Sequence, residues 1–162
     1  MEKLKDRLLL NVALFQPEIA QNMGTILRLC ACFGVPLHVI RPCGFPFSSK
    51  ALKRAVLDYS NLTEPKTHLN YVSYIESQKS SGENGRNILL TTRGSTDLWR
   101  FKFKEFDSLV FGNESSGVSD DVRNSVNETV AIPMPGGGRS LNLAVSAGIA
   151  LGEAIRQLSY IT

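Results

Sequence analysis

The sequence has no long apolar run, no even set of cysteines and no large excess of one charge. No apolar stretch among its 162 residues approaches the roughly 18 residues that a membrane-spanning helix needs. Three cysteines are an odd number in a chain of this length, which argues against a disulfide-stabilised scaffold. The first residues mix charge signs, Asn11 interrupts the apolar run that follows, and no small-residue cleavage site is present. We therefore expect no signal peptide and a cytosolic protein.

Internal repeats, low-complexity tracts and linker-like segments are also lacking. Apolar residues make up 43% of the chain and charged residues 20%, which is typical of a folded globular protein and not of a disordered one. A chain of 162 residues suits one hydrophobic core. Length and composition therefore predict a single domain over residues 1–162.

Positive charge is concentrated in the first part of the chain, although the net charge is only +3. Between Arg41 and Arg54 there is no acidic residue. Lys50, Lys53 and Arg54 recur at positions i, i+3 and i+4 of a helix predicted over residues 49–57. Such a face can bind phosphates. Charge alone favours the other interpretation, which is a solvated helix face.

Short apolar runs alternate with helix-like segments along the chain. Strands are predicted over residues 8–15, 37–40, 87–92, 108–111 and 129–132, because each of these segments is short and apolar. Further helices are predicted from Asn22, as the cap, to about residue 33, and then over residues 71–79 and 142–158. This alternation predicts an α/β domain with a mainly parallel sheet.

The last predicted helix carries a stripe of small and apolar residues from Ala144 to Leu158. Gly148 lies in this stripe, although a glycine inside a helix costs about 1 kcal/mol relative to alanine. We expect a close backbone approach at Gly148. The stripe is then either a tightly packed site or subunit contact, or the core side of an ordinary helix.

Cys30, Cys32, His38 and Cys43 lie close together in the sequence, which raises the question of a zinc site. Cys30 and Cys32 point about 200° apart on a helix and cannot share one ligand shell. Structural zinc sites also favour a C-x₂₋₄-C spacing. Buried free thiols are the better interpretation, and no metal is expected. The common dinucleotide and phosphate loops, G-x-G-x-x-G and GK[ST], are absent as well.

Two candidate sites lie at predicted strand ends. The run from Pro135 to Ser140 contains three successive glycines and leads into the helix at Asn142, where free backbone N–H groups can bind a ligand. It is either a flexible connection or a close approach to a ligand or another segment. After the strand 108–111, Gly112 leaves room and Glu114 places a carboxylate at the carboxyl edge of the sheet. The alternative for Glu114 is an acid at the N-terminus of the next helix.

Three segments together resemble the SPOUT methyltransferases, and within them the small ribose 2′-O-methyltransferases. The segments are Pro17-Glu18-Ile19 with Asn22, Gly24 and Arg28-Leu29-Cys30; Phe111-Gly112-Asn113-Glu114 with Gly117; and Ile132-Pro133-Met134 with Arg139-Ser140-Leu141-Asn142-Leu143. Their order and spacing match that family's three motifs, and the similarity extends over nearly the whole chain. The chain most resembles the minimal bacterial enzymes that methylate the wobble nucleotide of certain leucine tRNAs.

The resemblance implies a sheet with helices on both faces, a C-terminal deep trefoil knot, a homodimer, and tRNA bound across both subunits. It also implies S-adenosyl-L-methionine as the cofactor. The residues that match the family's cofactor contacts are Leu90, Gly112, Ile132, Met134, Ser140 and Leu141. The residues implied to bind RNA are Asn22 and Arg28, together with the basic face of Lys50, Lys53 and Arg54.

The implied reaction transfers a methyl group to a ribose 2′-hydroxyl, with Arg28, Glu114 and Asn142 as the catalytic residues. An apolar pocket favours the transition state, because the sulfonium charge disperses during the displacement. A guanidinium stays protonated in proteins, so we expect Arg28 to grip a phosphate rather than to act as a base. Glu114 is expected to orient Arg28 or nearby backbone, and Asn142 and Ser140 to fix the ribose or the methionine end. The base is unassigned.

The chain departs from the family pattern at several positions. Asn113 stands where the family usually has proline, Val118-Ser119 replaces a common Leu-Pro, and Gly138 stands where a serine often precedes the motif arginine. Close relatives often carry a tyrosine where this chain has Gly152, and Tyr160 is the nearest alternative.

Two other functions are compatible with the same motifs. One is a ribosomal-RNA 2′-O-methyltransferase of the same superfamily, against which the lack of an appended RNA-binding domain argues. The other is a non-catalytic RNA-binding dimer that has kept the fold. The presence of Arg28, Glu114, Ser140 and Asn142 in one chain argues against that alternative.

Overall fold

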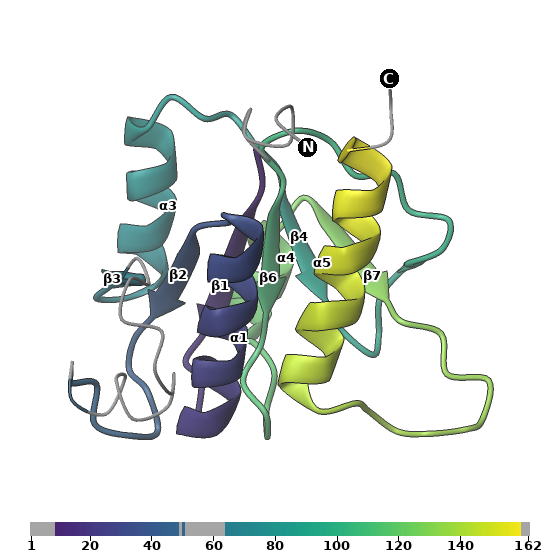
Figure 1. Ribbon diagram of the computed structural model, residues 1–162, viewed down its shortest axis with the longest axis horizontal. Coiled ribbons are helices and arrows are strands. Elements are labelled where there is room, and N and C mark those ends of the chain that lie inside the picture. Colours follow the sequence, from purple (N-terminus) through teal and green to yellow (C-terminus); the bar gives the residue numbers. More distant parts are fainter. Residues whose placement is uncertain (1–8, 49, 51–63, 160–162) are drawn as a thin grey trace.

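The computed structural model describes residues 9–48, 50 and 64–159. Its strands form one seven-stranded sheet in the order β3-β2-β1-β6-β4-β7-β5, in which all neighbouring strands are parallel (Figure 1). The strands are β1 (Asn11–Phe15), β2 (Leu37–Ile40), β3 (Lys66–His68), β4 (Asn87–Leu90), β5 (Thr96–Asp97), β6 (Ser108–Phe111) and β7 (Glu128–Ala131). The helices of this part of the chain are α1 (Ala20–Phe33), α3 (Tyr71–Ser80), α4 (Asp120–Ser125) and α5 (Leu143–Ser159).

Helices cover both faces of the sheet, and alternate strand residues feed two separate cores. One core contains Val12 of β1 and packs against α1 and α5, with Leu151 of α5 fully buried. The other contains Ala13 of β1 and packs against Tyr74 of α3 and Val122 of α4. The strands in the middle of the sheet are therefore buried on both sides, which explains why they are nearly continuous apolar runs in the sequence. This arrangement confirms the predicted α/β fold class.

β7 lies between β4 and β5, although β4 and β5 follow one another in the sequence. The connection over residues 91–95 must therefore cross β7. At the crossing, a Cβ on Gly94 would meet the backbone of Val130 and Ala131, so a larger residue does not fit there. The N–H of Thr91 donates to the Val130 carbonyl, and the N–H of Leu98 donates to the Ala131 carbonyl. A threaded C-terminal segment requires a crossing of this kind, and the trefoil knot itself stays a prediction.

Most predicted elements are confirmed. β2 and β6 have the predicted bounds, and α5 begins one residue after its expected cap, Asn142. No strand was predicted at β3 or β5, and no bounds were predicted for α4. The predicted cap Asn22 is wrong, because α1 begins at Ala20 and Asn22 lies within its first turn. The helix predicted over residues 49–57 lies outside the described residues, apart from residue 50.

The close approach predicted at Gly148 is not found among the described residues. A Cβ on Gly148 would meet nothing within 4 Å. α5 instead packs onto the sheet and α1 through fully buried neighbours, among them Ala147, Ala150 and Ala154. Among the described residues, no helix is long and apolar enough to cross a membrane.

Candidate functional site

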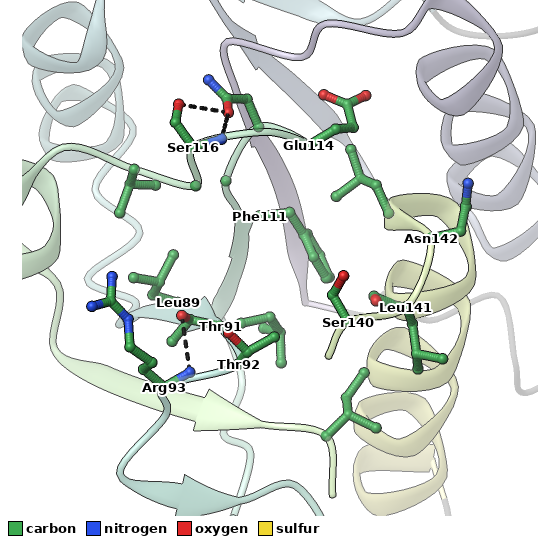
Figure 2. Close-up of a pocket in the computed structure, with 18 of the residues that line it drawn as sticks. Leu89, Thr91, Thr92, Arg93, Phe111, Glu114, Ser116, Ser140, Leu141 and Asn142 are labelled. Carbon is green, nitrogen blue, oxygen red and sulfur yellow. Dashed lines mark hydrogen bonds between the residues drawn. The ribbon is translucent and has the colours of Figure 1, made fainter. Parts of the chain in front are cut away.

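A cavity of about 650 Å³ opens where β4, β6 and β7 end. Figure 2 shows Glu114 and Ser116 on one side of it, Phe111 in the middle, and Ser140, Leu141 and Asn142 beside α5. The carboxyl ends of parallel strands are the usual ligand-binding edge of an open α/β sheet. The volume lies within the range of small-molecule and cofactor sites.

A tight turn after β6 forms one wall of the cavity. The N–H of Asn113 donates to the Gly117 carbonyl at 2.9 Å, and the N–H of Gly117 donates back to the Asn113 carbonyl at 3.1 Å. The Asn113 side chain also accepts from the backbone N–H and the hydroxyl of Ser116, at 2.7 and 2.9 Å. Proline cannot donate the first of these bonds, so asparagine supplies a different way of closing the turn.

Gly112 is required by this turn and not by space for a ligand. A Cβ on Gly112 would lie 2.5 Å from the carbonyl carbon of Gly117. The room predicted beside the end of β6 is therefore filled by the chain's own backbone. This corrects the expectation that Gly112 leaves open space, although Gly112 still lines the cavity.

Glu114 braces the start of α1. Its Oε2 accepts from the N–H of Glu18 at 2.8 Å, and its Oε1 accepts from the N–H of Ile19 at 3.1 Å and from Asn22 Nδ2 at 3.3 Å. α1 has no side-chain cap of its own, so a carboxylate from another part of the chain satisfies two backbone donors at its positive end. Of the two orienting roles predicted for Glu114, the structure shows the contact with backbone. It does not cap the helix that follows it in the sequence.

Asn142 connects α5 to the same network. Its Oδ1 accepts from the backbone N–H groups of Ala144 and Val145, at 2.8 and 3.3 Å, which caps α5 as predicted. Its Nδ2 donates to Asn22 Oδ1 at 3.0 Å. The chain of hydrogen bonds Glu114–Asn22–Asn142 thus joins residues from all three motif segments. Among the described residues, only one N–H of the Asn22 amide and one N–H of the Asn142 amide are used. The second N–H of each amide is available to an oxygen atom of a ligand in the cavity.

The predicted cofactor residues come together. All six line the cavity: Leu90, Gly112, Ile132, Met134, Ser140 and Leu141. The cavity is therefore lined both by apolar side chains and by the Glu114–Asn22–Asn142 network. Such a lining suits a flat apolar group, with a few fixed polar atoms to orient it.

The predicted RNA-binding residues are not all brought to the cavity. Asn22 lines it, but Arg28 does not and lies exposed on α1. Lys50 is also exposed and away from the lining. Lys53 and Arg54 lie outside the described residues, so the continuity of that basic face stays a prediction.

Of the two interpretations of the three glycines after β7, a close approach to another described segment of the chain is not found. A Cβ on Gly136 or Gly137 would meet nothing within 4 Å, and one on Gly138 would meet only Met134 Sδ at 3.7 Å. Gly137 has a φ of +79°, which favours glycine, and its N–H donates to the Met134 carbonyl. Within this chain the loop is therefore a turn with room around it.

Arg93, Arg123 and Arg139 also line the cavity. Arg139 belongs to the third motif segment, but no role was predicted for any of the three arginines, because they are far apart in the sequence and only the fold brings them together. Arg93 lies on the crossing connection, Arg123 on α4 and Arg139 on the connection before α5. Arg123 Nη2 donates to Thr91 Oγ1 at 3.4 Å.

The three cysteines and the one histidine considered for zinc do not form a site. Cys30 is buried, Cys32 is exposed and Cys43 is half-buried. Burial raises the pKa of Cys30 to about 12 and also raises the pKa of Cys43. His38 Nδ1 instead lies 2.9 Å from His68 Nε2, away from the cavity. Within residues 9–48, 50 and 64–159, no group of three or more possible metal ligands is found.

Known proteins of similar sequence cover nearly the whole chain. The model described as the SpoU rRNA Methylase family matches residues 9–152. The chain belongs to this family. A tRNA (cytidine(34)-2′-O)-methyltransferase of Beijerinckia indica subsp. indica is 42% identical over 147 residues, which are 91% of each chain. The protein of the same name from Escherichia coli K12 is 36% identical over 154 residues, 94% of this chain and 96% of its own.

Solved structures agree with this assignment to the SpoU family. A structure described as "Structural insights into the 2-OH methylation of C/U34 on tRNA" has a TM-score of 0.85 and 43% identity, and the match covers 93% of this chain and 96% of that one. AviRb of Streptomyces viridochromogenes, a SpoU methyltransferase in complex with the cofactor AdoMet, has a TM-score of 0.78 and 26% identity. The match covers 99% of this chain and 62% of AviRb. The chain is a methyltransferase of the SpoU family with the SPOUT fold.

Proposed function

We propose that this chain transfers a methyl group from S-adenosyl-L-methionine to the ribose 2′-hydroxyl of the wobble nucleotide, position 34, of leucine tRNAs. The nucleotide is cytidine or a modified uridine. The observation that carries the proposal is the Glu114–Asn22–Asn142 network at the cavity edge. It joins the three motif segments at one place in the lining of the cavity.

The tRNA substrate is preferred to ribosomal RNA because of sequence similarity: two relatives named for tRNA are 42% and 36% identical to this chain, and an rRNA methyltransferase from Sinorhizobium meliloti is 25% identical. The relatives named tRNA (cytidine(34)-2′-O)-methyltransferase are matched over 91% and 96% of their own length. The match to an AdoMet-bound rRNA methyltransferase from Sinorhizobium meliloti covers only 56% of that chain.

The residues around the cavity fit the proposed cofactor. Leu90, Ile132 and Met134 supply apolar surface for an adenosine, while Ser140 and Asn142 supply polar groups in the same lining. When bound, S-adenosyl-L-methionine supplies an electrophilic methyl group on a sulfonium. A dry apolar wall favours the loss of that charge in the transition state.

The chain's own groups mainly position the reactants. Glu114 has both oxygens engaged by α1 and Asn22, so it acts as a brace and not as a free base. Through Asn22 it holds the amide of Asn142, whose remaining N–H can orient a ribose oxygen. Correct placement of a weak nucleophile accounts for much of the acceleration in reactions of this type.

Arg28 is exposed on α1 and outside the lining of this chain's cavity. We assign it to a phosphate next to the reacting nucleotide in the cavity of a second copy of the chain, which makes the homodimer part of the site. A guanidinium forms bidentate, charge-assisted bonds with phosphate. Lys50, Lys53 and Arg54 extend this contact with tRNA in the proposal, and the reaction takes place in the cytosol.

The test is methyl transfer to a panel of tRNA transcripts, with the modified position mapped by mass spectrometry. The expected product carries one ribose methyl group at nucleotide 34 of leucine tRNAs. Methylation of ribosomal RNA instead, or cofactor binding without any RNA product, would contradict the proposal. Mixed dimers of an Arg28→Ala chain with a cofactor-binding mutant test the shared site. They should regain activity at one of two sites.

A further inference from the structure

The cavity carries more positive charge than its proposed cofactor can use. Its lining includes three arginines, Arg93, Arg123 and Arg139, and one carboxylate, Glu114. Glu114 is hydrogen-bonded to α1 and Asn22 and to no arginine. S-adenosyl-L-methionine has a sulfonium and an ammonium group against one carboxylate, so it is itself a cation. The excess of arginine therefore points to a different, anionic ligand.

None of the three arginines is neutralised within the described part of the chain. Its ion pairs are Arg86–Asp107 and Arg156–Glu153, both away from the cavity. Across those same residues, the guanidinium groups of Arg93 and Arg139 make no hydrogen bond. Arg123 makes only the long one to Thr91 Oγ1, at 3.4 Å.

Arg93 and Arg123 converge on one residue. Thr91 Oγ1 accepts from the backbone N–H of Arg93 at 3.3 Å as well as from Arg123 Nη2. The Arg93 side chain lies on the side of the cavity opposite Ser140 and Asn142, as Figure 2 shows. The Arg123 guanidinium and the Arg93 backbone thus meet at one hydroxyl, and both arginines line the cavity, at a wall that the network on α1 and α5 leaves free.

We propose that Arg93 and Arg123 form a binding site for a backbone phosphate of the RNA substrate at this wall of the cavity. The inference rests on the proposed function, because it assigns the anion to the RNA that the enzyme methylates. Arginine suits this ligand, since its planar fork makes two parallel hydrogen bonds to phosphate oxygens. The site would hold the chain of the RNA on the side of the cavity away from Asn142.

The test compares tRNA binding and cofactor binding in the same variants. Arg93→Gln, Arg123→Gln and their combination remove the guanidinium charges and keep polar side chains. Arg100→Gln is the matched control, because Arg100 is exposed and outside the cavity lining. Binding of an unmodified leucine tRNA transcript is measured across salt concentrations, and S-adenosylhomocysteine binding is measured by calorimetry.

In the double variant, the slope of log affinity against log salt should fall by up to about two phosphate contacts, at roughly 0.7 to 0.9 per contact. S-adenosylhomocysteine affinity should not change. Arg123 is half-buried, so Arg123→Lys tests the charge if the glutamine variant does not fold. The lysine should keep the slope.

Two results would overturn the site. One is a salt slope of the double variant that equals the slope of Arg100→Gln. A wild type that does not bind tRNA at all would overturn the site in the same way. The other is weaker S-adenosylhomocysteine binding with an unchanged slope, which would assign the arginines to the cofactor's carboxylate. Methyl transfer by the wild type is measured separately. If the wild type transfers no methyl group, the proposed function is wrong. The salt slope of tRNA binding still tests the phosphate site in that case.

Discussion

Glu114 has both carboxylate oxygens engaged by backbone and amide donors from α1. Glu114→Gln keeps the shape but replaces one acceptor by an NH₂ group that faces other donors. We expect unfolding to become easier by about 1 to 3 kcal/mol, the cost of an unsatisfied polar contact. Urea unfolding would measure this, with Glu76→Gln on the exposed side of α3 as the control. Equal midpoints for the two variants would show that the brace contributes nothing to stability.

The lowered pKa of His38 makes the stability of the fold depend on pH. Burial, with His68 and Lys66 nearby, lowers the pKa of His38 from 6.5 to about 4. The folded protein therefore disfavours the proton, and the stabilisation is complete above about pH 6.5 and is lost as the pH falls toward 4. A single such group changes the free energy of unfolding by at most about 1.4 kcal/mol per pH unit. Urea unfolding at pH 7 and pH 5 should show a smaller loss in His38→Gln than in the wild type.

At the scale of elements, Asn142 caps the N-terminus of α5 and also links it to Asn22 of α1. Asn142→Asp keeps an acceptor for Ala144 and Val145 but loses the donor to Asn22, whereas Asn142→Ala loses both. We expect the alanine variant to lose about 1 kcal/mol of stability, as for other helix caps. The aspartate variant should retain most of the stability and still lose methyl-transfer activity. Thermal unfolding and kcat separate the two effects, and full activity in the aspartate variant would remove the link from the mechanism.

The crossing of β7 predicts an unequal response of two glycines. Gly94→Ala places a Cβ against the backbone of Val130 and Ala131, whereas Gly136→Ala meets nothing within 4 Å and has no positive φ. We expect little or no folded Gly94→Ala protein, and a Gly136→Ala protein within about 0.5 kcal/mol of the wild type, as for ordinary surface changes. Soluble yield and thermal unfolding would show the difference. Equal stability of both variants would mean that the connection crosses β7 elsewhere.

The elements differ in how far the sequence predicts them. β2 and β6 are short apolar runs buried on both faces, and their bounds follow from the pattern. β5 has two residues, Thr96 and Asp97, and exists only because β7 offers its backbone there. The Glu114–Asn142 side of the site follows from the motifs. The Arg93–Arg123 side does not, because those residues meet only through the crossing and α4.

The whole molecule leaves an apolar stripe on the outer side of α5. Leu141 is 39% exposed and Val145 is 49% exposed, and Gly148 and Gly152 follow at helical spacing with nothing packed where a Cβ would lie. No described residue packs where a Cβ of Gly148 or Gly152 would lie, so this stripe is available to a second copy. This supports the homodimer of the proposed function.

Val145→Lys tests that assembly. A lysine in the middle of the stripe would bury a charge in the interface, so we expect a monomer. Because Arg28 is assigned to the cavity of the second copy, the monomer should also lose methyl transfer while its fold is retained. Light scattering after size-exclusion chromatography gives the mass, and far-UV circular dichroism gives the fold. Val72→Lys is the control, since Val72 is 64% exposed on α3, on the other face of the sheet, and should leave both mass and activity unchanged. A dimeric Val145→Lys protein, or an active monomer, would contradict a site shared between two copies.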